Sequence, residues 1–380
     1  MKLFHLSDLH LGKRLFEFSL IEDQEYILDK ILDAVRSERP DAVIIAGDVY
    51  DKPVPSAEAV SLFDSFLFRL SELGAATFVI SGNHDSPERI AFGGRLMQNS
   101  GTYLSPVYDG RTEPFTLCDV FGEVNFYLLP FIKPAHVRRY FPDEIIESYT
   151  DAMRLATRHM DVDPTKRNVL VTHQFVTGAS RSDSEEISVG GSDNVDASVF
   201  DGFDYVALGH IHGPQKIGND RIRYSGTPLK YSFSEAEQEK SIAVIDLKEK
   251  GDVDISFLPL SPIRDLREIR GTYAELTLRD NYINTNTDDY LHITLTDEND
   301  VPDALSKLRV IYPNLMKLDY DNARTRSQTE FTAAEAPEKR SPLELFSELF
   351  EKQNGAPMDE YQQKYMEGLI TKIWDREDKR

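Results

Sequence analysis

The chain has 380 residues, of which 40% are hydrophobic and 28% charged, so it can build a packed core and more than one domain. The formal net charge of −22 argues against a protein that holds nucleic acid through its overall charge. One cysteine, Cys118, excludes an intramolecular disulfide, and the lack of a long apolar run predicts a cytoplasmic protein without signal peptide or membrane span.

The N-terminal part alternates short apolar runs with helical patterns. Residues 2–6 read as a buried strand, and a helical face then ends near Pro40, formed by Ile27, Leu28, Ile31, Leu32 and Val35. Residues 42–46 and 77–80 are two further strands. Between them lies a second helical face, formed by Val60, Phe63, Phe66, Leu67 and Leu70. This β-α-β-α-β order predicts an α/β sheet with helical crossovers.

Later strands are predicted at residues 126–129, 168–172, 205–208, 222–225, 242–247 and 253–258. A boundary is expected near Pro259–Pro262, followed by a small α+β domain with strands at 290–296 and 315–320 and a helix at 304–311. The polar stretch that follows reads as a linker. We therefore divide the chain into residues 1–262, 263–325, a linker at 326–340 and a helical segment at 341–380.

The helical segment at 341–380 has clear start signals. Ser341-Pro342-Leu343-Glu344 is a capping box, and Asp359 opens a second helix. Apolar side chains gather on one face of each helix, among them Leu345, Phe346, Leu349, Phe350, Tyr361, Tyr365, Met366, Leu369, Ile370, Ile373 and Trp374. These faces either fold back on the body of the protein or dock on a partner.

Polar clusters follow five of the predicted strands. In chain order they are Asp8-x-His10, Gly47-Asp48-x-x-Asp51, Gly82-Asn83-His84-Asp85, His173 and Gly209-His210-x-His212. The carboxyl ends of strands are where open α/β sheets present ligand-binding side chains. Imidazoles, carboxylates and one residue able to bridge are what a pair of divalent ions needs in order to hold a phosphate. The sequence therefore predicts a two-metal phosphoesterase site.

Spacing within the clusters supports this reading. Asp8 and His10 are alternate residues on an extended segment and can bind one ion together. His210 and His212 have the same spacing, although a turn between them could send each to a different ion. Glycine before three of the clusters, at Gly47, Gly82 and Gly209, lets the backbone bend close to the site.

An ordinary structural role is the competing interpretation for each of these residues. A single Asp-x-His or Gly-Asn-His-Asp is more often a loop or a cap than a metal site, but five such elements after strands are hard to obtain by chance. His5 lies inside a strand and is expected in the core. His136, His159 and His292 have no metal-like neighbours and are assigned no metal role.

The five clusters, in this order, resemble those of the calcineurin-like metallophosphoesterase superfamily. That resemblance implies a four-layer αββα core and two ion sites that share Asp48. One site is implied at Asp8, His10, Asp48 and His212, and the other at Asp48, Asn83, His173 and His210. It also implies manganese as the activating ion, whereas the ligand types alone are equally compatible with iron or zinc.

His84 follows the ligand Asn83 and is expected to face the substrate, where the resemblance implies that it protonates or stabilises the leaving oxygen. Asp85 is a candidate for orienting His84, and Asp51 for supporting the metal ligands. Ordinary loop hydrogen bonding is an equally good reading of Asp85 and Asp51.

Within the superfamily the chain is similar to DNA-repair nuclease subunits that act with a coiled-coil ATPase. The segments that carry this similarity are residues 4–13, Val189–Ser192, 203–212 and 224–233. It implies a capping, DNA-binding role for 263–325 and docking of 341–380 on the ATPase, with a homodimer inside a heterotetramer. The implied activities are a 3′–5′ exonuclease on duplex ends and a single-strand endonuclease, in double-strand-break and hairpin processing.

Two other functions are compatible with parts of the pattern. The metal elements alone allow a phosphodiesterase of small nucleotides or phosphoesters. A non-enzymatic DNA tether predicts missing ligands, and none is missing. Two divalent ions offset only four of the 22 negative charges, so DNA binding must depend on a partner or on local basic residues, for which the candidates are Lys13, Arg14, Arg89, Arg95, Arg181 and Lys230.

Overall fold

The computed structural model describes residues 1–185, 193–322 and 357–377, together with 325, 343, 346, 347 and 349–351. The linker expected at 326–340, the Val189–Ser192 segment and the capping box at Ser341 therefore lie outside the described residues, apart from Leu343. Within the described residues no helix is both long and apolar enough to cross a membrane.

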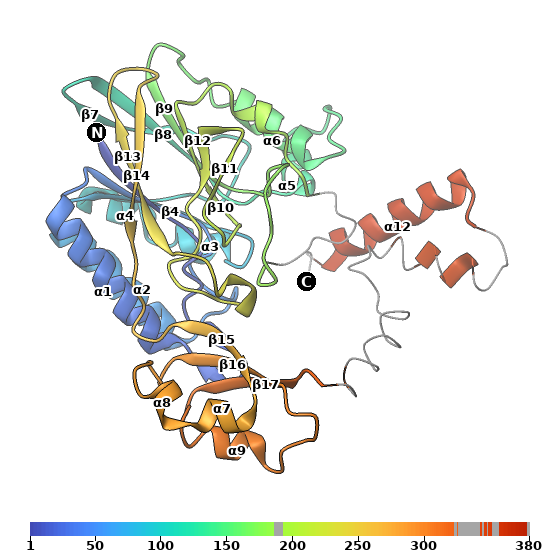
Figure 1. Cartoon of the computed structure of the whole chain (residues 1–380). Coiled ribbons are helices and arrows are strands. Elements are labelled where there is room, and N and C mark those ends of the chain that lie inside the picture. Colours follow the sequence, from blue (N-terminus) through green and yellow to red (C-terminus); the bar gives the residue numbers. More distant parts are fainter. Residues whose placement is uncertain are drawn as a thin grey trace.

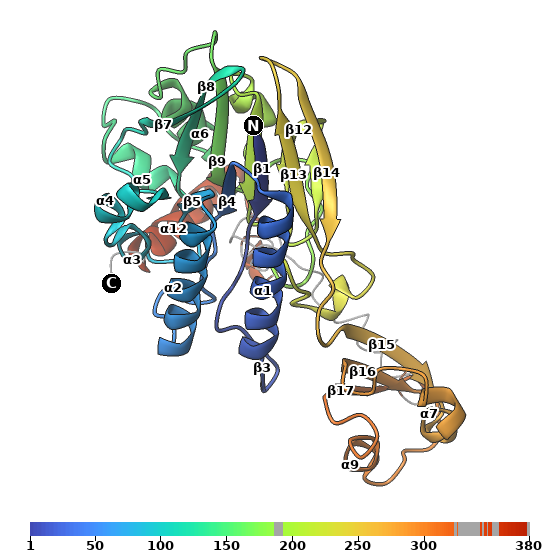
Figure 2. The ribbon, with the colours of Figure 1, turned by 90° about the vertical axis from the view of Figure 1, so that its left-hand side faces the viewer.

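Two six-stranded sheets form the centre of the molecule (Figures 1 and 2). The first has the order β14 (Val253–Pro259), β13 (Ser241–Leu247), β1 (Lys2–Leu6), β4 (Ala42–Ala46), β5 (Ala76–Ile80), β6 (Thr102–Leu104). The second has the order β11 (Gln215–Ile217), β12 (Asn219–Tyr224), β10 (Tyr205–Gly209), β9 (Arg167–His173), β8 (Gly122–Leu129), β7 (Pro114–Asp119). In the first, β1, β4, β5 and β6 run parallel, and in the second β8, β9, β10 and β12 do, so the carboxyl ends of each set meet at one edge.

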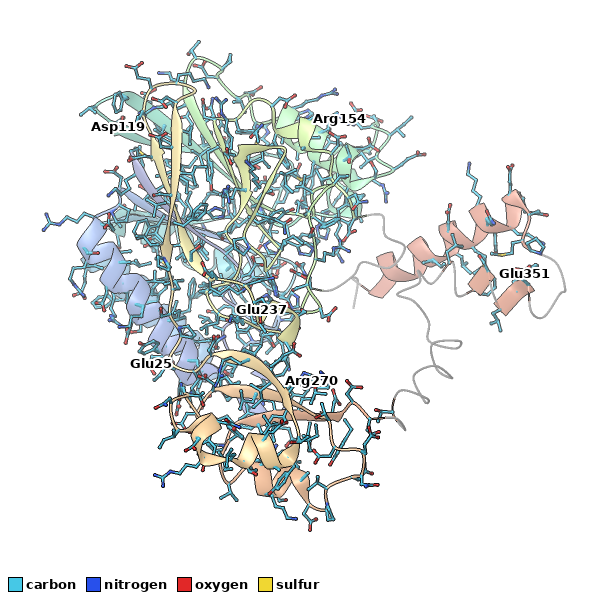
Figure 3. All side chains as sticks on the ribbon, viewed as in Figure 1. Glu25, Asp119, Arg154, Glu237, Arg270 and Glu351 are labelled. Atoms are coloured by element: carbon cyan, nitrogen blue, oxygen red, sulfur yellow. The ribbon has the colours of Figure 1, made fainter. Side chains whose placement is uncertain are left out.

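Alternation along the strands explains why the sheets pack on both faces. In β4, Val43 and Ile45 join the cluster that contains helix α1, whereas Ala42, Ile44 and Ala46 join the cluster between the sheets. The Phe78 ring of β5 stacks on Phe126 of β8 across the two sheets, with ring centroids 4.2 Å apart. Side chains fill the space between the sheets in Figure 3, whereas the labelled Glu25 and Arg154 lie outside.

Helices cover the outer faces and complete the four layers. On the first sheet lie α1 (Ile21–Glu38) and α2 (Ala57–Glu72), and on the second lie α5 (Pro134–Arg138) and α6 (Tyr149–Arg158). The αββα fold expected from the resemblance is therefore confirmed. The prediction that Val60 belongs to the buried face of its helix was wrong. Val60 is 44% exposed, because it lies on the solvent side of α2 while Phe63 and Leu67 face the core.

Short elements lie between the main strands and helices along the chain. They are β2 (Arg14–Leu15), β3 (Phe18–Ser19), α3 (Pro87–Ala91), α4 (Gly94–Met97) and the 3₁₀ helices η1 (Gln98–Ser100), η2 (Ala197–Phe200) and η3 (Phe233–Glu235). The sequence pattern predicted none of them, and it also missed β6, β7 and β11. These strands are short or, as in β7, only half-buried, so they lack a continuous apolar signal.

A third, smaller sheet follows β14 in the chain, with its own core (Figure 1). Its parallel strands are β15 (Leu266–Gly271), β16 (Tyr290–Leu295) and β17 (Leu315–Tyr320), joined by α7 (Tyr273–Thr277), α8 (Arg279–Tyr282) and α9 (Ala304–Leu308). The strand β15 was not expected, and α9 is shorter than the predicted helix. Arg264 and the Tyr290 hydroxyl both bond the Asp23 carboxylate of α1, at 3.0 and 2.7 Å, which ties this sheet to the large core.

Helix α12 (Glu360–Glu377) lies to one side of the sheets in Figure 1. It opens as expected at Asp359, whose Oδ1 accepts a hydrogen bond from Gln362 N at 2.8 Å while Asp359 N donates to Gln362 Oε1. Tyr361 and Tyr365 are 79% and 61% exposed, so these residues of the predicted apolar face are not buried against the body.

Removing the Phe78 ring tests the packing between the sheets. We expect Phe78→Ala to lower the free energy of unfolding by about 3–5 kcal/mol, because the lost ring leaves a cavity between two strands. Urea unfolding followed by far-ultraviolet circular dichroism measures the change. Val120→Ala is the control, since Val120 is 93% exposed and should shift stability by less than about 0.5 kcal/mol. Equal midpoints for the two variants would contradict the packing argument.

Candidate metal centre

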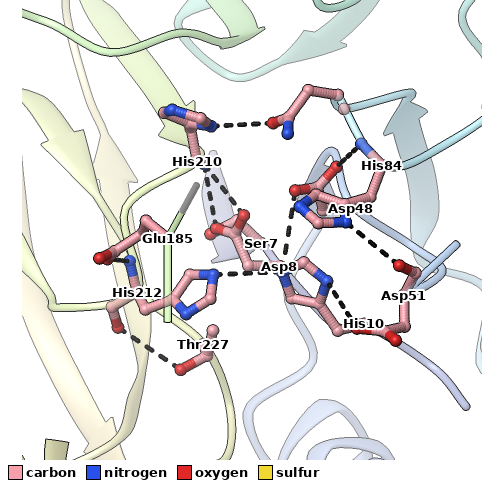
Figure 4. A network of polar contacts seen from close by, with 12 residues as sticks. Ser7, Asp8, His10, Asp48, Asp51, His84, Glu185, His210, His212 and Thr227 are labelled. Atoms are coloured by element: carbon pink, nitrogen blue, oxygen red, sulfur yellow. Dashed lines mark hydrogen bonds and ion pairs between the residues drawn. The ribbon is translucent and has the colours of Figure 1, made fainter. Parts of the chain in front are cut away.

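The two sheets bring their polar strand ends together at one place (Figure 4). The loops after β1, β4 and β5 meet the ends of β9 and β10, and backbone hydrogen bonds from Asp8 N to Gly47 O and from His10 N to Asp48 O hold the first two loops side by side. All seven expected ligands meet here, namely Asp8, His10, Asp48, Asn83, His173, His210 and His212.

The first donor set gathers around His10. Its Nε2 lies 3.1 Å from His212 Nε2, and both can supply a ligand atom together with an Asp8 oxygen, all within 4.8 Å of one another. His212 Nδ1 lies 2.6 Å from the Ser184 hydroxyl, a contact suited to an Nδ1–H donor. With Nδ1 protonated, a neutral His212 presents the lone pair of Nε2 toward His10.

The second donor set gathers around the Asn83 side-chain oxygen. Asn83 Oδ1 lies 3.0 Å from His173 Nε2 and 2.9 Å from His210 Nδ1. His173 Nδ1 donates to the Ala46 carbonyl at 2.8 Å, so in the neutral ring Nε2 carries no hydrogen and faces Asn83 Oδ1 lone pair to lone pair. Converging lone pairs of this kind fit a cation placed between them.

Asp48 lies between the two donor sets. Its Oδ2 is 3.2 Å from His173 Nε2 and 3.7 Å from His10 Nε2. Its Oδ1 accepts a hydrogen bond from the His84 backbone N–H at 2.8 Å, which fixes the carboxylate plane. This geometry is the one that the predicted bridging role of Asp48 needs.

Backbone strain concentrates on the ligands. Asp8, His10, Asp48 and His210 have φ angles of 54°, 44°, 46° and 98°, a region that non-glycine residues rarely adopt. Such conformations cost about 1–3 kcal/mol each and persist where the surroundings enforce them, commonly at functional sites. The chain therefore accepts strain at four of the seven expected ligands.

Two of the glycines before the clusters allow close approach. A Cβ on Gly47, whose φ is +88°, would lie 2.4 Å from His173 Nδ1, and one on Gly209 would lie 1.8 Å from the Ala46 carbonyl oxygen. A side chain at either position would push the two sheets apart at the site. This is the role that the sequence predicts for them.

Burial and pairing set the charges of the donors. Burial keeps the pKa of His10 and His210 well below the usual range, so both rings are neutral, as metal ligands must be. Burial raises the pKa of Asp8 to about 6. Burial also disfavours the charged forms of Asp48 and His173, yet their mutual attraction wins, holding the pKa of Asp48 well below its ordinary value and raising that of His173 to about 9. The metal-free site therefore holds a proton where a cation would fit.

Asp85 has different partners from those expected. Its carboxylate accepts hydrogen bonds from the backbone N–H groups of Val49, Tyr50 and Gly82, at 2.9–3.0 Å, so it joins the loops after β4 and β5. The ring that it was expected to orient is held by a backbone carbonyl instead, since His84 Nδ1 lies 3.1 Å from Asp51 O. We therefore correct the role of Asp85 from orienting His84 to holding two ligand loops together.

His84 and Asp51 both lie at the first donor set. His84 can supply a ligand atom together with His10 and Asp48, within 4.8 Å of one another. Asp51 Oδ1 lies 3.8 Å from His10 Nδ1 and pairs with Lys13 at 2.7 Å. Asp51 thus borders the ligand that it was expected to support.

Sequence patterns missed several residues that hold the ligands. Glu185 Oε1 accepts from His212 N at 2.7 Å, and Glu235 and Lys240 form a buried ion pair beside the same ligand. Gln24 of α1 donates to the His10 carbonyl at 2.7 Å. Only Gln24 carries a sequence signal, a polar residue beside the apolar face of an amphipathic helix.

Comparison with known proteins finds two family models that match this chain. A family model described as calcineurin-like phosphoesterase matches residues 1–214, and one described as type 5 capsule protein repressor C-terminal domain matches residues 262–354. The SbcD protein of the SbcCD nuclease from Staphylococcus epidermidis is 34% identical over 384 residues, which cover 99% of this chain and 100% of that protein. SbcD of Staphylococcus saprophyticus is 37% identical over 322 residues, 84% of each chain.

The chain belongs to the calcineurin-like phosphoesterases, in the SbcD family. This confirms the predicted class of enzyme, a metal-dependent phosphoesterase. It also agrees with the donor chemistry, because the imidazole, carboxylate and amide ligands of the site suit divalent metals. The two staphylococcal SbcD proteins match the chain along nearly all or most of its length, well beyond the metal loops.

The proton shared by His173 and Asp48 gives a pH prediction for the metal-free protein. A histidine whose pKa rises on folding stabilises the fold fully below its unfolded pKa of about 6.5, and this contribution is lost as the pH rises through about 9. In EDTA-treated protein with ¹⁵N-labelled histidine, we expect the His173 ring to titrate near pH 9. Asp48→Asn should move the midpoint down, whereas a wild-type midpoint near 6.5 would contradict the pairing.

Proposed function

We propose that this protein is a metal-dependent DNA nuclease that acts with an SbcC-like coiled-coil ATPase in double-strand-break and hairpin processing. The observation that carries the proposal is the convergence of seven ligand side chains in a chain similar over its whole length to the SbcD protein of the SbcCD nuclease. The proposed activities are a 3′–5′ exonuclease on duplex ends and an endonuclease on single strands.

We assign two divalent ions to the two donor sets, with Asp48 between them, and manganese as the ion of choice. When bound, such ions offset the negative charge of a phosphodiester and lower the pKa of a water molecule. The protein supplies neutral imidazoles at His10 and His210, a strained backbone that aims the ligands, and loops fixed by Asp85. We propose that these ligands are positioned before substrate binds.

His84 is the proposed proton donor to the leaving oxygen. Its Nδ1–H can donate to the Asp51 carbonyl, which leaves Nε2 for a contact with substrate. His84 is only half-buried, whereas the ligands His10 and His173 are fully buried, so it can reach a bound phosphate. Geometry and exposure thus support a role in catalysis.

Local basic residues offer little free charge for DNA. Lys13 pairs with Asp51, Arg181 with Asp193 and Lys230 with Asp265, at 2.7, 2.7 and 2.9 Å. Three of the six basic candidates are therefore already neutralised, in a chain of net charge −22. We propose that the isolated chain binds DNA weakly and in a salt-sensitive way, and that the complex supplies most of the affinity.

The proposed complex uses surfaces outside the metal site. We assign residues 263–325 to a capping, DNA-binding domain and 341–380 to the ATPase contact, where Tyr361 and Tyr365 are exposed. Exposed apolar side chains around α2, α3 and α4, with Phe92 at 85% and Leu96 at 79%, offer a surface for the proposed homodimer. Two nuclease and two ATPase chains then form a heterotetramer, and its proposed place is the cytoplasm.

DNA cleavage by the purified full-length chain tests the activity. With Mn²⁺ we expect it to degrade single-stranded DNA and to shorten duplex DNA from its 3′ ends. His84→Gln should still bind Mn²⁺ in a calorimetric titration but lose about 10²–10⁴-fold in cleavage rate, the usual contribution of general acid catalysis. Asp48→Asn is the matched control that should lose metal and cleavage together.

Small phosphodiesters are the competing substrates. Bis-p-nitrophenyl phosphate, measured under the same conditions, should turn over slowly compared with DNA. Rapid turnover of the ester without DNA cleavage would replace the nuclease by a small-molecule phosphodiesterase. Loss of bound metal in His84→Gln would show that His84 is a ligand and not the acid.

Removal of residues 341–380 tests the partner contact. Light scattering after gel filtration should give a 2:2 assembly for the full-length chain with the SbcC-like ATPase of the same organism. The shortened chain should elute apart from the ATPase yet keep its Mn²⁺-dependent cleavage of single-stranded DNA. Retained association would move the contact elsewhere, and lost cleavage would place part of the catalytic unit in the removed segment.

A further inference from the structure

We propose that Glu235, held by Lys240, is a positioning residue that fixes the tautomer and orientation of the metal ligand His212 through the Ser184 hydroxyl. The inference rests on the proposed metal role of His212 and adds to it a dedicated support. Neither Glu235 nor Lys240 nor Ser184 belongs to the clusters that carry the metal site.

The contacts form a chain from the ligand inward. His212 Nδ1 lies 2.6 Å from Ser184 Oγ and 3.5 Å from Glu235 Oε1. Ser184 Oγ lies 2.5 Å from the same Glu235 oxygen, and Glu235 Oε2 lies 2.6 Å from Lys240 Nζ. Each group therefore touches the next by a polar atom.

Proton positions follow from this order. Glu235 Oε1 only accepts when ionised, so the Ser184 hydroxyl donates to it and turns a lone pair toward His212. His212 must then carry its hydrogen on Nδ1, which leaves Nε2 bare and directed at His10 Nε2, 3.1 Å away. This series of hydrogen bonds thus selects the one neutral tautomer of His212 that can bind a metal through Nε2.

Burial of Glu235 and Lys240 keeps the two charges paired. Glu235 is fully buried and Lys240 is 5% exposed, and an isolated charge at either position would be strongly destabilising. Lys240 Nζ also bonds the His212 carbonyl at 3.0 Å and Thr227 Oγ1 at 2.8 Å. One cation therefore holds both the carboxylate behind the ligand and the backbone of the ligand itself.

The other histidine ligands have different supports. His173 Nδ1 donates to the Ala46 carbonyl, a backbone group, and His10 Nδ1 is a buried atom without a hydrogen-bond partner. His212 differs from these two ligands because the buried pair of Glu235 and Lys240 lies behind its ring. Groups of this kind behind a ligating histidine typically change metal affinity about 10–100-fold when removed.

Two measurements on the full-length chain test the proposal without using activity. Calorimetric titration with Mn²⁺ should show one of two sites weakened about 10–100-fold in Glu235→Gln and in Ser184→Ala, with the other site unchanged. Ser184→Thr keeps the hydroxyl and should bind like wild type. In metal-free protein with ¹⁵N-labelled histidine, the His212 ring should be the Nδ1–H tautomer in wild type and lose that preference in Ser184→Ala.

Asp119→Asn is the control, because Asp119 forms a partly buried ion pair with Arg167 on β9, at the opposite end of that strand from His173. Unchanged Mn²⁺ affinity in Glu235→Gln, equal losses in Asp119→Asn and Glu235→Gln, or a wild-type Nε2–H tautomer would each overturn the proposal. A wild-type chain that binds Mn²⁺ but cuts no DNA would reject the nuclease function and leave this inference standing. A wild-type chain that binds no Mn²⁺ would overturn both.

Discussion

Crowding of electron-pair donors in a buried space is the constraint on which the site depends. His10 Nε2 and His212 Nε2 lie 3.1 Å apart, and Asn83 Oδ1 lies within 3.0 Å of two imidazole nitrogens. Each such contact needs a proton or a metal ion between its two atoms, because two bare lone pairs repel. The stacked cores of the two sheets press them together, as in the contact between Phe78 and Phe126, and a positive charge between the donors then lowers the energy of the whole arrangement.

The close approach of the ligands is accompanied by strained backbone conformations. Left-handed φ angles at Asp8, His10, Asp48 and His210 are tolerated because hydrogen bonds hold the loops from several sides. Asp85 illustrates this, since one buried carboxylate accepts three backbone N–H groups from two loops. Burial raises the pKa of Asp85 to about 7, and the nearby charge of Asp48 contributes to the rise. In the metal-free site, burial and nearby charge therefore shift the pKa values of supporting residues as well as those of the ligands.

Sequence patterns predicted the long, buried elements and the ligands, for physical reasons. Strands such as β4 are apolar on both faces, and each ligand follows a strand within a few residues. The supports of the ligands could not be found in this way. Glu235 lies 23 residues beyond His212 and Gln24 lies 14 residues beyond His10, so only the folded chain shows that they touch. Adjacency to His84 suggested an orienting role for Asp85, but only the folded chain shows that its carboxylate turns toward backbone groups.

The segment between β12 and β13 joins the small sheet to the metal centre. On one side, Lys230 pairs with Asp265 at 2.9 Å, and the Phe233 ring of η3 packs against His292 of β16 with centroids 5.3 Å apart. On the other side, Ser234 Oγ accepts from Asp183 N at 3.0 Å, and Glu235 reaches Ser184 and His212. Three consecutive residues of η3 thus make three different contacts. Phe233 packs against a strand of the small sheet, Ser234 bonds the loop that carries Ser184, and Glu235 reaches the ligand His212. The small sheet and the ligand His212 therefore contact the same short helix, η3.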